Sequence, residues 1–215
     1  MDKREVLERI ESGRVIPVIR TDSKEKAAEI AEAILEGGIN CLEITMTVPN
    51  AIQLLGELSR KYQESVIVGA GTVLDEGVAK DCIAAGAKFI VTPYLNLEVI
   101  DVCNQAGILS CVGALTPTEI FTAWRAGADV IKVFPIAALG GASYLKALKA
   151  PFPDIKLLPT GGISIDNFRE FLEAGAIAVG VGGEISNWDL LKSKGKSEIT
   201  ERFVLLIGAL NEDQK

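Results

Sequence analysis

The sequence contains no histidine, which removes the usual imidazole base and the commonest ligand of zinc and iron sites. Cysteine is scarce, and no two cysteines have the C-x-x-C spacing of a metal or redox site. In their apolar surroundings they are expected to be small core residues in a reducing, cytoplasmic compartment: Cys41, Cys82, Cys103 and Cys111. No clustered Asp/Glu motif suggests bound magnesium. We therefore expect neither a metal site nor a cofactor.

Positive charge is also in deficit, since 22 Lys and Arg face 29 Asp and Glu for a net charge of −7. The basic residues form no cluster with interleaved aromatic residues, so nucleic acid is not an expected partner. No apolar run is long enough to span a bilayer, which argues against a membrane partner. The amino terminus, MDKREVLERI, is polar and lacks the apolar segment of a signal peptide.

What the chain does have is a regular alternation of short apolar runs and longer amphipathic segments. The strand-like runs begin near residues 15, 41, 66, 89, 109, 130, 156 and 178. Their spacing of about 23 residues is typical of a strand–loop–helix unit. Eight such units with nearly continuous apolar strands predict a closed (β/α)₈ TIM barrel. The whole chain, 1–215, is expected to form this one domain, with an extra helix at residues 2–12.

An open, doubly wound sheet is the alternative arrangement of the same units. It would leave two strand edges, and it usually carries a G-x-G-x-x-G turn after its first strand. Here the first strand is followed by Arg20, Thr21 and Asp22, with no glycine. The closed barrel is therefore favoured.

Capping residues mark where several helices begin. The predicted starts are Ser23, Asp75, Thr116-Pro117 and Asp166. A further helix is expected over residues 197–210, and the hydrophilic stretch KSKGKS at 192–197 is predicted to be a loop.

The run VIKVFP at 130–135 contains the most informative residue, because a lysine lies in the middle of a predicted buried strand. Lys132 shares a face of that strand with Val130 and Phe134. The only other charge well inside an apolar strand is Glu43. Burial favours the neutral amine, which is the nucleophilic form of lysine, and in a chain without histidine the carboxylate is the strongest candidate for a proton shuttle. The pair suggests Schiff-base chemistry on a carbonyl substrate; a snorkelling lysine or a structural ion pair are the alternatives.

Several short motifs occur together in a fixed order. They are PVIR (17–20), LEIT (42–45), GAGT (69–72), TPTE (116–119), IKVFP (131–135) and LPTGGI (158–163). As a set they resemble the KDPG/KHG aldolase family over roughly residues 15–210. The resemblance implies a metal-independent class I aldolase on a (β/α)₈ barrel, cytoplasmic and homotrimeric. Its members cleave the keto acid 2-keto-3-deoxy-6-phosphogluconate (KDPG) to pyruvate and glyceraldehyde 3-phosphate, and often 4-hydroxy-2-oxoglutarate to pyruvate and glyoxylate.

The resemblance also implies roles for individual residues. Lys132 matches the Schiff-base lysine, and Glu43 matches the general acid/base. Thr72 matches the residue that holds the pyruvate carboxylate. The remaining expected substrate contacts are Arg20 to an anionic group, Pro93, Phe134 and Thr160 as pocket walls, and the backbone of Gly161, Gly162, Gly182 and Gly183 around a distal phosphate. Loops after the last two strands are the usual phosphate site of such barrels, although glycine there can also serve only a tight turn.

Two positions depart from the family pattern. Thr47 stands where many members have arginine, and Glu184 stands where a serine often helps to hold the phosphate. If the Glu184 side chain points inward, it repels phosphate and selects a substrate without one. An aldolase for an unphosphorylated or differently configured keto acid therefore remains an alternative, as does a non-catalytic barrel that binds a metabolite.

Overall fold

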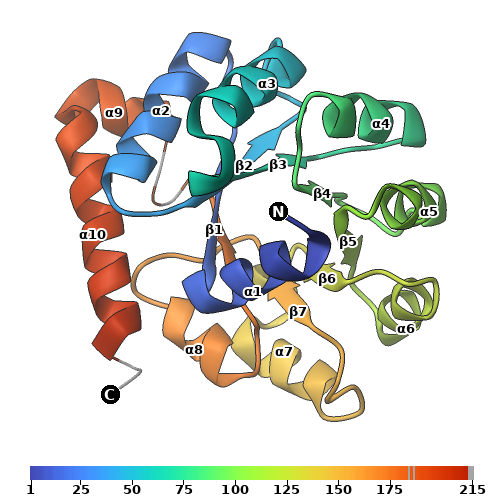
Figure 1. Ribbon diagram of the computed structural model, residues 1–215. Helices are drawn as coiled ribbons and strands as arrows, with labels where there is room; N and C mark the ends of the chain where they lie inside the picture. The colour runs from blue at the N-terminus through green and yellow to red at the C-terminus, as the bar shows by residue number, and fades with distance from the viewer. Residues whose placement is uncertain (184, 186, 213–215) are drawn as a thin grey trace.

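The eight apolar runs form one sheet of parallel strands that curls into a barrel, seen in the computed structural model (Figure 1). The structure describes residues 1–183, 185 and 187–212. Its strands are β1 (Val15–Ile19), β2 (Cys41–Thr45), β3 (Ile67–Gly71), β4 (Phe89–Val91), β5 (Leu109–Ala114), β6 (Val130–Val133), β7 (Leu157–Pro159) and β8 (Val179–Val181).

The strand order shows how the barrel closes. Each strand from β1 to β6 pairs in parallel with the next one along the chain, and β8 returns to pair with β1. Between β7 and β8 the closure is a single parallel bridge from Thr160 to Gly180, with a hydrogen bond of 3.1 Å from Ile177 N to Leu157 O. The predicted (β/α)₈ barrel is confirmed.

Helices surround this barrel (Figure 1). They are α1 (Lys3–Gly13), α2 (Lys24–Glu36), α3 (Ala51–Tyr62), α4 (Glu76–Ala84), α5 (Leu97–Ala106), α6 (Pro117–Arg125), α7 (Ala142–Lys149), α8 (Phe168–Glu173), α9 (Trp188–Lys194) and α10 (Lys196–Glu212), with short 3₁₀ turns η1 (Gln63–Ser65) and η2 (Ala137–Leu139). Three predicted caps are confirmed. The side chains of Ser23 and Asp75 accept hydrogen bonds from the first turns of α2 and α4, and Thr116 forms a capping box with Glu119 on α6. Of the helices described, none is long and apolar enough to cross a bilayer.

Two local predictions were wrong. Helix α8 begins after Asn167 rather than after Asp166, because the Asn167 side chain accepts a hydrogen bond from Ser164 N and holds the preceding residues in a turn. The stretch 192–197 is not a loop, since α9 runs to Lys194 and α10 starts at Lys196. Lys192 and Lys194 lie exposed in the last turn of α9, where their positive charge stabilises the end of the helix. Only Gly195 interrupts the helices, with a left-handed φ of 85°.

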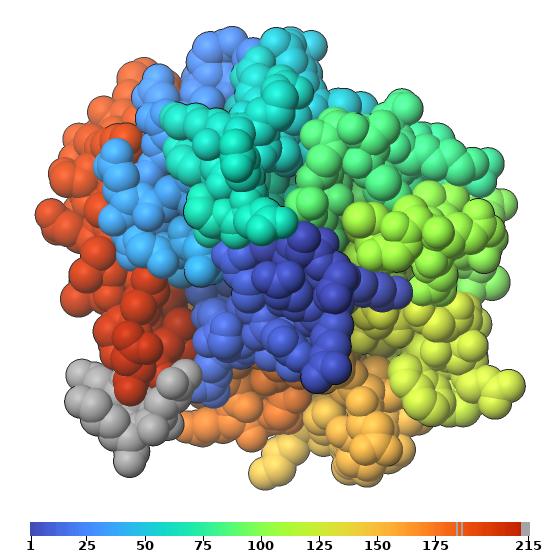
Figure 2. All heavy atoms as spheres, in the orientation of Figure 1, coloured from blue at the N-terminus to red at the C-terminus, as the bar shows by residue number. Residues whose placement is uncertain are grey.

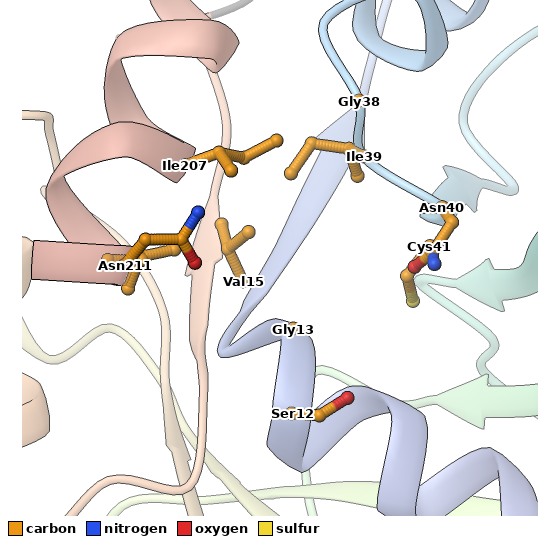
Figure 3. A pocket seen from close by; sticks show the side chains of 10 residues that line it. Ser12, Gly13, Val15, Gly38, Ile39, Asn40, Cys41, Ile207 and Asn211 are labelled. Carbon is orange, nitrogen blue, oxygen red and sulfur yellow. The ribbon is translucent and has the colours of Figure 1, made fainter. Parts of the chain in front are cut away.

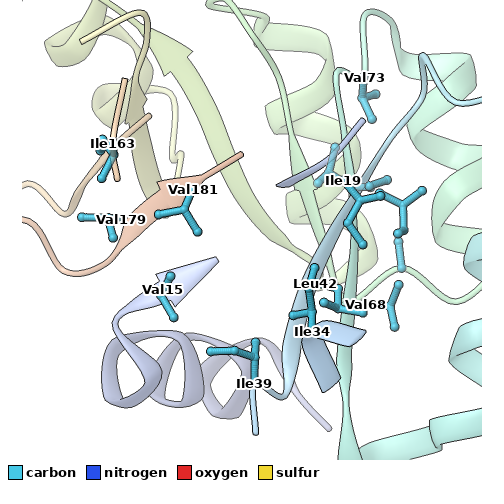
Figure 4. Close-up of a cluster of buried hydrophobic side chains, with 14 of the residues drawn as sticks. Val15, Ile19, Ile34, Ile39, Leu42, Val68, Val73, Ile163, Val179 and Val181 are labelled. Atoms are coloured by element: carbon cyan, nitrogen blue, oxygen red, sulfur yellow. The ribbon is translucent and has the colours of Figure 1, made fainter. Parts of the chain in front are cut away.

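Apolar side chains pack in two layers. The inner layer fills the lower barrel and consists of Ile16, Cys41, Ile67, Phe89, Val91, Leu109, Cys111, Val130, Leu158 and Ala178, joined by Val6 and Ile10 of α1. The outer layer lies between strands and surrounding helices; Figure 4 shows part of it, including Ile19, Leu42 and Val179. Both layers hold the strands in register, so the upper ends of the strands are fixed in position.

Helix α1 closes the amino-terminal end of the barrel. In Figure 2 atoms of this segment occupy the middle of the face that is shown. Polar contacts fasten it there: Lys3 pairs with Asp129 at 2.9 Å, Glu11 pairs with Lys156, and Arg9 donates to Glu64 O at 2.6 Å. A ligand therefore reaches the barrel interior from the carboxyl ends of the strands.

Candidate active site

A cavity of about 390 Å³ opens at the carboxyl ends of the strands. Of the eleven residues that the sequence placed around a substrate, all except Glu43 line it: Arg20, Thr72, Pro93, Lys132, Phe134, Thr160, Gly161, Gly162, Gly182 and Gly183. Three further lining residues were not foreseen: Val18, Ile163 and Gly180. The structure thus gathers the predicted residues around one cavity, while the role of each stays a prediction.

Lys132 and Glu43 lie on the inner face of the barrel, on β6 and β2. Their side chains are only 7% and 2% exposed, and Lys132 Nζ lies 3.9 Å from Glu43 Oε1. That separation is beyond hydrogen-bonding distance. Oε1 is buried and has no hydrogen-bond partner within the described part of the chain. A buried carboxylate oxygen without a partner is costly, and this one lies beside an amine that lines the cavity.

Apolar side chains flank Lys132 along its strand. Val130 lies two residues earlier on the same face and belongs to the inner layer. The ring centroid of Phe134, a residue 36% exposed at the cavity mouth, lies 5.3 Å from Lys132 Nζ. The amine is therefore largely shielded from water.

Thr72 has an unusual backbone at the end of β3. Its φ is +57°, a left-handed conformation that is an outlier for a β-branched residue. In this conformation its hydroxyl accepts a hydrogen bond of 3.1 Å from Arg20 Nη2. Strain of this kind is typical of functional sites, and here it places a hydroxyl beside a guanidinium at the cavity.

Glycines on the inner face of the barrel leave room for the neighbouring side chains and backbone of the site. A Cβ built on Gly71 would lie 1.8 Å from Glu43 Oε1, and one on Gly180 would lie 2.3 Å from Thr160 Oγ1. A Cβ on Gly113 would meet the backbone of Pro93 at 2.3 Å. The sequence carried a signal for this feature that went unused, namely glycines two residues apart within strands, as in GAG at 69–71 and GVG at 180–182.

The four glycines expected near a distal phosphate fall into two groups. Gly161 and Gly162 have left-handed φ values of 97° and 75°, so the turn itself requires glycine there. Gly182 and Gly183 have no such φ, and nothing lies within 4 Å of a Cβ built on Gly183. At these two positions neither the backbone conformation nor steric crowding requires glycine. The absence of a side chain there is compatible with an anion approaching the main chain.

The two departures from the family pattern have different outcomes. Thr47 is exposed, does not line the cavity, and lies with its hydroxyl 2.8 Å from that of buried Thr45. Thr47 itself therefore does not contact the cavity, and its predicted effect on carboxylate binding stays a prediction. Glu184 lies outside the described residues, and its predicted effect on phosphate stays a prediction.

A second cavity, of about 140 Å³, lies at the opposite end of the barrel between α10, the end of α1 and the loop before β2 (Figure 3). Among the described residues that line it, the one ionisable side chain is Cys41, and burial raises the pKa of that thiol far above its usual range. It offers no group for acid–base or amine chemistry. Across residues 1–183, 185 and 187–212, no three Asp, Glu or Cys side chains gather as metal ligands would.

Known proteins resemble this chain over most of its length. The family model described as KDPG and KHG aldolase matches residues 6–202. A 2-dehydro-3-deoxy-phosphogluconate aldolase of Treponema pallidum is 36% identical over 78% of this chain and 79% of its own length. A 2-dehydro-3-deoxy-6-phosphogalactonate aldolase of Escherichia coli is 33% identical over 80% of this chain and 83% of its own.

A solved structure is similar as well. The KDPG aldolase of Legionella pneumophila, crystallised with pyruvate captured as a covalent carbinolamine intermediate, superposes with a TM-score of 0.85. It is 34% identical, and the match covers 93% of this chain and 97% of that one. The similarity in sequence and in fold therefore includes both the barrel and its cavity end.

Proposed function

Because this chain belongs to the KDPG and KHG aldolase family, we propose that it is a class I aldolase that reversibly cleaves a 2-keto-4-hydroxy acid to pyruvate and an aldehyde. The observation that carries the proposal is the Lys132–Glu43 pair, in which a buried amine that lines the cavity lies 3.9 Å from a buried carboxylate. A structural ion pair gains most from direct hydrogen bonds, which this pair lacks. Separate amine and carboxylate groups suit a nucleophile and a proton carrier.

The proposed reaction begins at Lys132. Its neutral amine attacks the C2 ketone to form a carbinolamine, and loss of water leaves an iminium. Glu43 supplies the proton for dehydration and then accepts the proton of the C4 hydroxyl as the C3–C4 bond breaks. The bond electrons move into the iminium, which gives an enamine and releases the aldehyde. Protonation of the enamine at C3 and hydrolysis of the resulting iminium release pyruvate. The carbinolamine captured in the Legionella relative supports the first step.

The rest of the cavity is assigned to the two ends of the substrate. Thr72 and Arg20 are proposed to bind the carboxylate of the keto acid, since a hydroxyl and a guanidinium already lie together there. Pro93, Phe134 and Thr160 form the walls. The main chain at Gly161, Gly162, Gly182 and Gly183 is proposed to bind a distal phosphate.

We propose KDPG as the principal substrate, with 4-hydroxy-2-oxoglutarate as a second one. Relatives at 36% and 33% identity act on a phosphogluconate and a phosphogalactonate derivative, so the configuration at C4 is the open question. A kinetic panel of keto acids that differ only at C4 and in the distal group decides it. The highest kcat/KM is expected for the phosphorylated gluconate derivative. A higher kcat/KM for unphosphorylated acids would show that KDPG is not the principal substrate. The proposed release of pyruvate through Lys132 would still hold.

Trapping with borohydride tests the reaction itself. Incubation with pyruvate and borohydride is expected to leave a stable secondary amine on Lys132, located by peptide mass spectrometry, and none in the Lys132→Met variant. An untouched Lys132 would favour the alternative of a non-catalytic metabolite-binding barrel.

The resemblance adds a metal-independent reaction, a cytoplasmic location and a homotrimer to the proposal. Four free, buried thiols are in keeping with a reducing compartment. The aromatic surface of Phe121 and Trp124, 44% and 43% exposed and joined by Phe152, has the composition of a subunit interface. Light scattering after size-exclusion chromatography tests the assembly, and a monomeric mass at micromolar concentration would reject it.

A further inference from the structure

Gly71 is the last residue of β3 and lies in register with Thr45 on β2, on the inner face of the barrel. It is buried, and a Cβ at this position would overlap three atoms of one side chain. The distances are 1.8 Å to Glu43 Oε1, 2.4 Å to Cδ and 2.6 Å to Cγ. The carboxylate of Glu43 thus occupies the space that any other residue at position 71 would fill with its own side chain.

The backbone does not require glycine here. Gly71 has no left-handed φ, so an alanine could adopt the same conformation without strain. The next residue shows the opposite mismatch, since Thr72 has the left-handed φ at which glycine would be expected. Gly71 and Thr72 thus both differ from the residue type that their backbone favours. Such a mismatch at two successive positions is expected where a functional site, rather than the strand, determines the amino acid.

The space at Gly71 matters because little else holds the carboxylate oxygen. Oε1 is the atom that faces Lys132 Nζ, and within the described residues it has no hydrogen-bond partner. Its position is therefore set by the walls around it. An alanine at position 71 would have to move Oε1 from 1.8 Å to the 3.4 Å at which ordinary contacts begin, through rotation of the Glu43 side chain or movement of β3.

We infer that Gly71 is a positioning residue that fixes the Glu43 carboxylate opposite Lys132 by leaving the space of a side chain empty. The effect on catalysis rests on the proposed function, whereas the effect on the position of the Glu43 carboxylate does not. A separate experiment tests each effect.

The first is a thermal-unfolding cycle that needs no activity. Gly71→Ala is expected to lower Tm in the presence of Glu43 and to leave Tm unchanged or higher when position 43 is alanine, because the overlapping carboxylate is then gone. Gly208→Ala is the control for the loss of a glycine, since nothing lies within 4 Å of a Cβ there. Equal Tm losses from Gly71→Ala in both backgrounds would overturn the inference.

The second experiment measures turnover. Gly71→Ala is expected to lower kcat by about 10²-fold, in line with the cost of a misplacement of roughly 1 Å, with a smaller change in KM. Borohydride trapping of pyruvate on Lys132 should persist, because the lysine itself is not displaced. Shortening the acid by Glu43→Asp in the Gly71→Ala background is expected to recover part of kcat, although Glu43→Asp alone lowers it.

The outcomes are distinguishable. A Gly71→Ala variant with the predicted Tm cycle and unchanged kcat would overturn the positioning role. Absence of any pyruvate adduct in the wild-type protein would instead reject the proposed function, and the catalytic part of this inference with it, while the Tm cycle still decides the geometry.

Discussion

Lys132 Nζ lies 3.9 Å from Glu43 Oε1 across the inside of the barrel, from strands that are not neighbours. Strands β3, β4 and β5 stand between β2 and β6 in the sheet, so the two side chains meet only because the sheet closes. The pair is buried and yet not hydrogen-bonded. The missing hydrogen bond favours the proposed catalytic roles of the two side chains over a purely structural ion pair.

Replacement of Lys132 by methionine, which has a similar length and no amine, is expected to reduce aldol cleavage below a hundredth of the wild-type rate. Pyruvate release in a coupled assay measures this. Because the change leaves the Glu43 carboxyl group buried without its amine partner, stability should fall, by about 3–5 kcal/mol. The double variant Lys132→Met/Glu43→Gln removes both ionisable groups and serves as the folded control. Residual activity above a hundredth would exclude Lys132 as the nucleophile.

Replacement of Glu43 by glutamine keeps the shape of the side chain and removes its ability to accept and return a proton. We expect kcat to fall by about 10²- to 10⁴-fold, the usual contribution of general acid–base catalysis. Borohydride should still trap pyruvate on Lys132, only more slowly, since the amine remains. An unchanged kcat would remove Glu43 from the mechanism, and the gap between the two side chains would then need another explanation.

The hydroxyl of Thr72 is expected to act in substrate binding. Thr72→Val keeps the branched shape and the left-handed backbone but removes the acceptor of the Arg20 hydrogen bond. The lost contact to a charged group should raise KM for the keto acid about tenfold, with a smaller change in kcat. Thr72→Ser is the matched control and should retain a KM near that of the wild type. Equal KM values for the two variants would show that the hydroxyl does not touch the carboxylate.

Much of this site could be predicted from the sequence because its strongest signals are local. A charge inside an apolar strand is visible in the sequence alone, and only Lys132 and Glu43 have that character among the strands. The barrel follows from the regular spacing of apolar runs, which predicts which end of each strand carries the chemistry. The caps at Ser23 and Asp75 depend on residues within three positions, so they too were predictable.

The parts that were missed depend on contacts between distant segments. The left-handed φ of Thr72 and the space beside Gly71 become visible only when β2 lies against β3, since the same letters GAGT also fit an ordinary turn. The break between α9 and α10 depends on a single residue, Gly195, in a stretch whose lysines resemble a solvated loop. Composition alone does not separate an exposed helix from an exposed loop.

Removal of divalent metal is expected to leave activity intact, because the iminium proposed to form on Lys132 would supply the electron sink that a metal would otherwise provide. Kinetic assays before and after prolonged dialysis against EDTA measure this. Addition of Mg²⁺, Mn²⁺ or Zn²⁺ to the dialysed protein should not raise kcat. A loss of activity that one of these ions restores would show a metal-dependent step and would contradict a purely lysine-based mechanism.

The buried thiol of Cys103 predicts a fall in stability at alkaline pH. Burial raises the pKa of this thiol from 9.0 to about 12, with smaller effects from Lys3 and Asp129. Between these values the unfolded chain loses the proton and the folded protein keeps it, so the free energy of unfolding decreases as pH rises through this range. At a pH 1.5 units above the unfolded pKa, the loss amounts to about 2 kcal/mol. Below pH 9 the thiol is protonated in both states and contributes no pH dependence.

Cys103→Ala tests this through the change in the free energy of unfolding with pH rather than through its value at one pH. The smaller side chain lowers that free energy by an amount that is the same at every pH. Urea unfolding at pH 8 and pH 10.5 should show a decrease that is smaller in Cys103→Ala than in the wild type by about 2 kcal/mol, because all other titrating groups are shared. Parallel curves for the two proteins would mean that Cys103 ionises as readily in the folded protein as in the unfolded chain, and so that α5 does not seal this thiol from water.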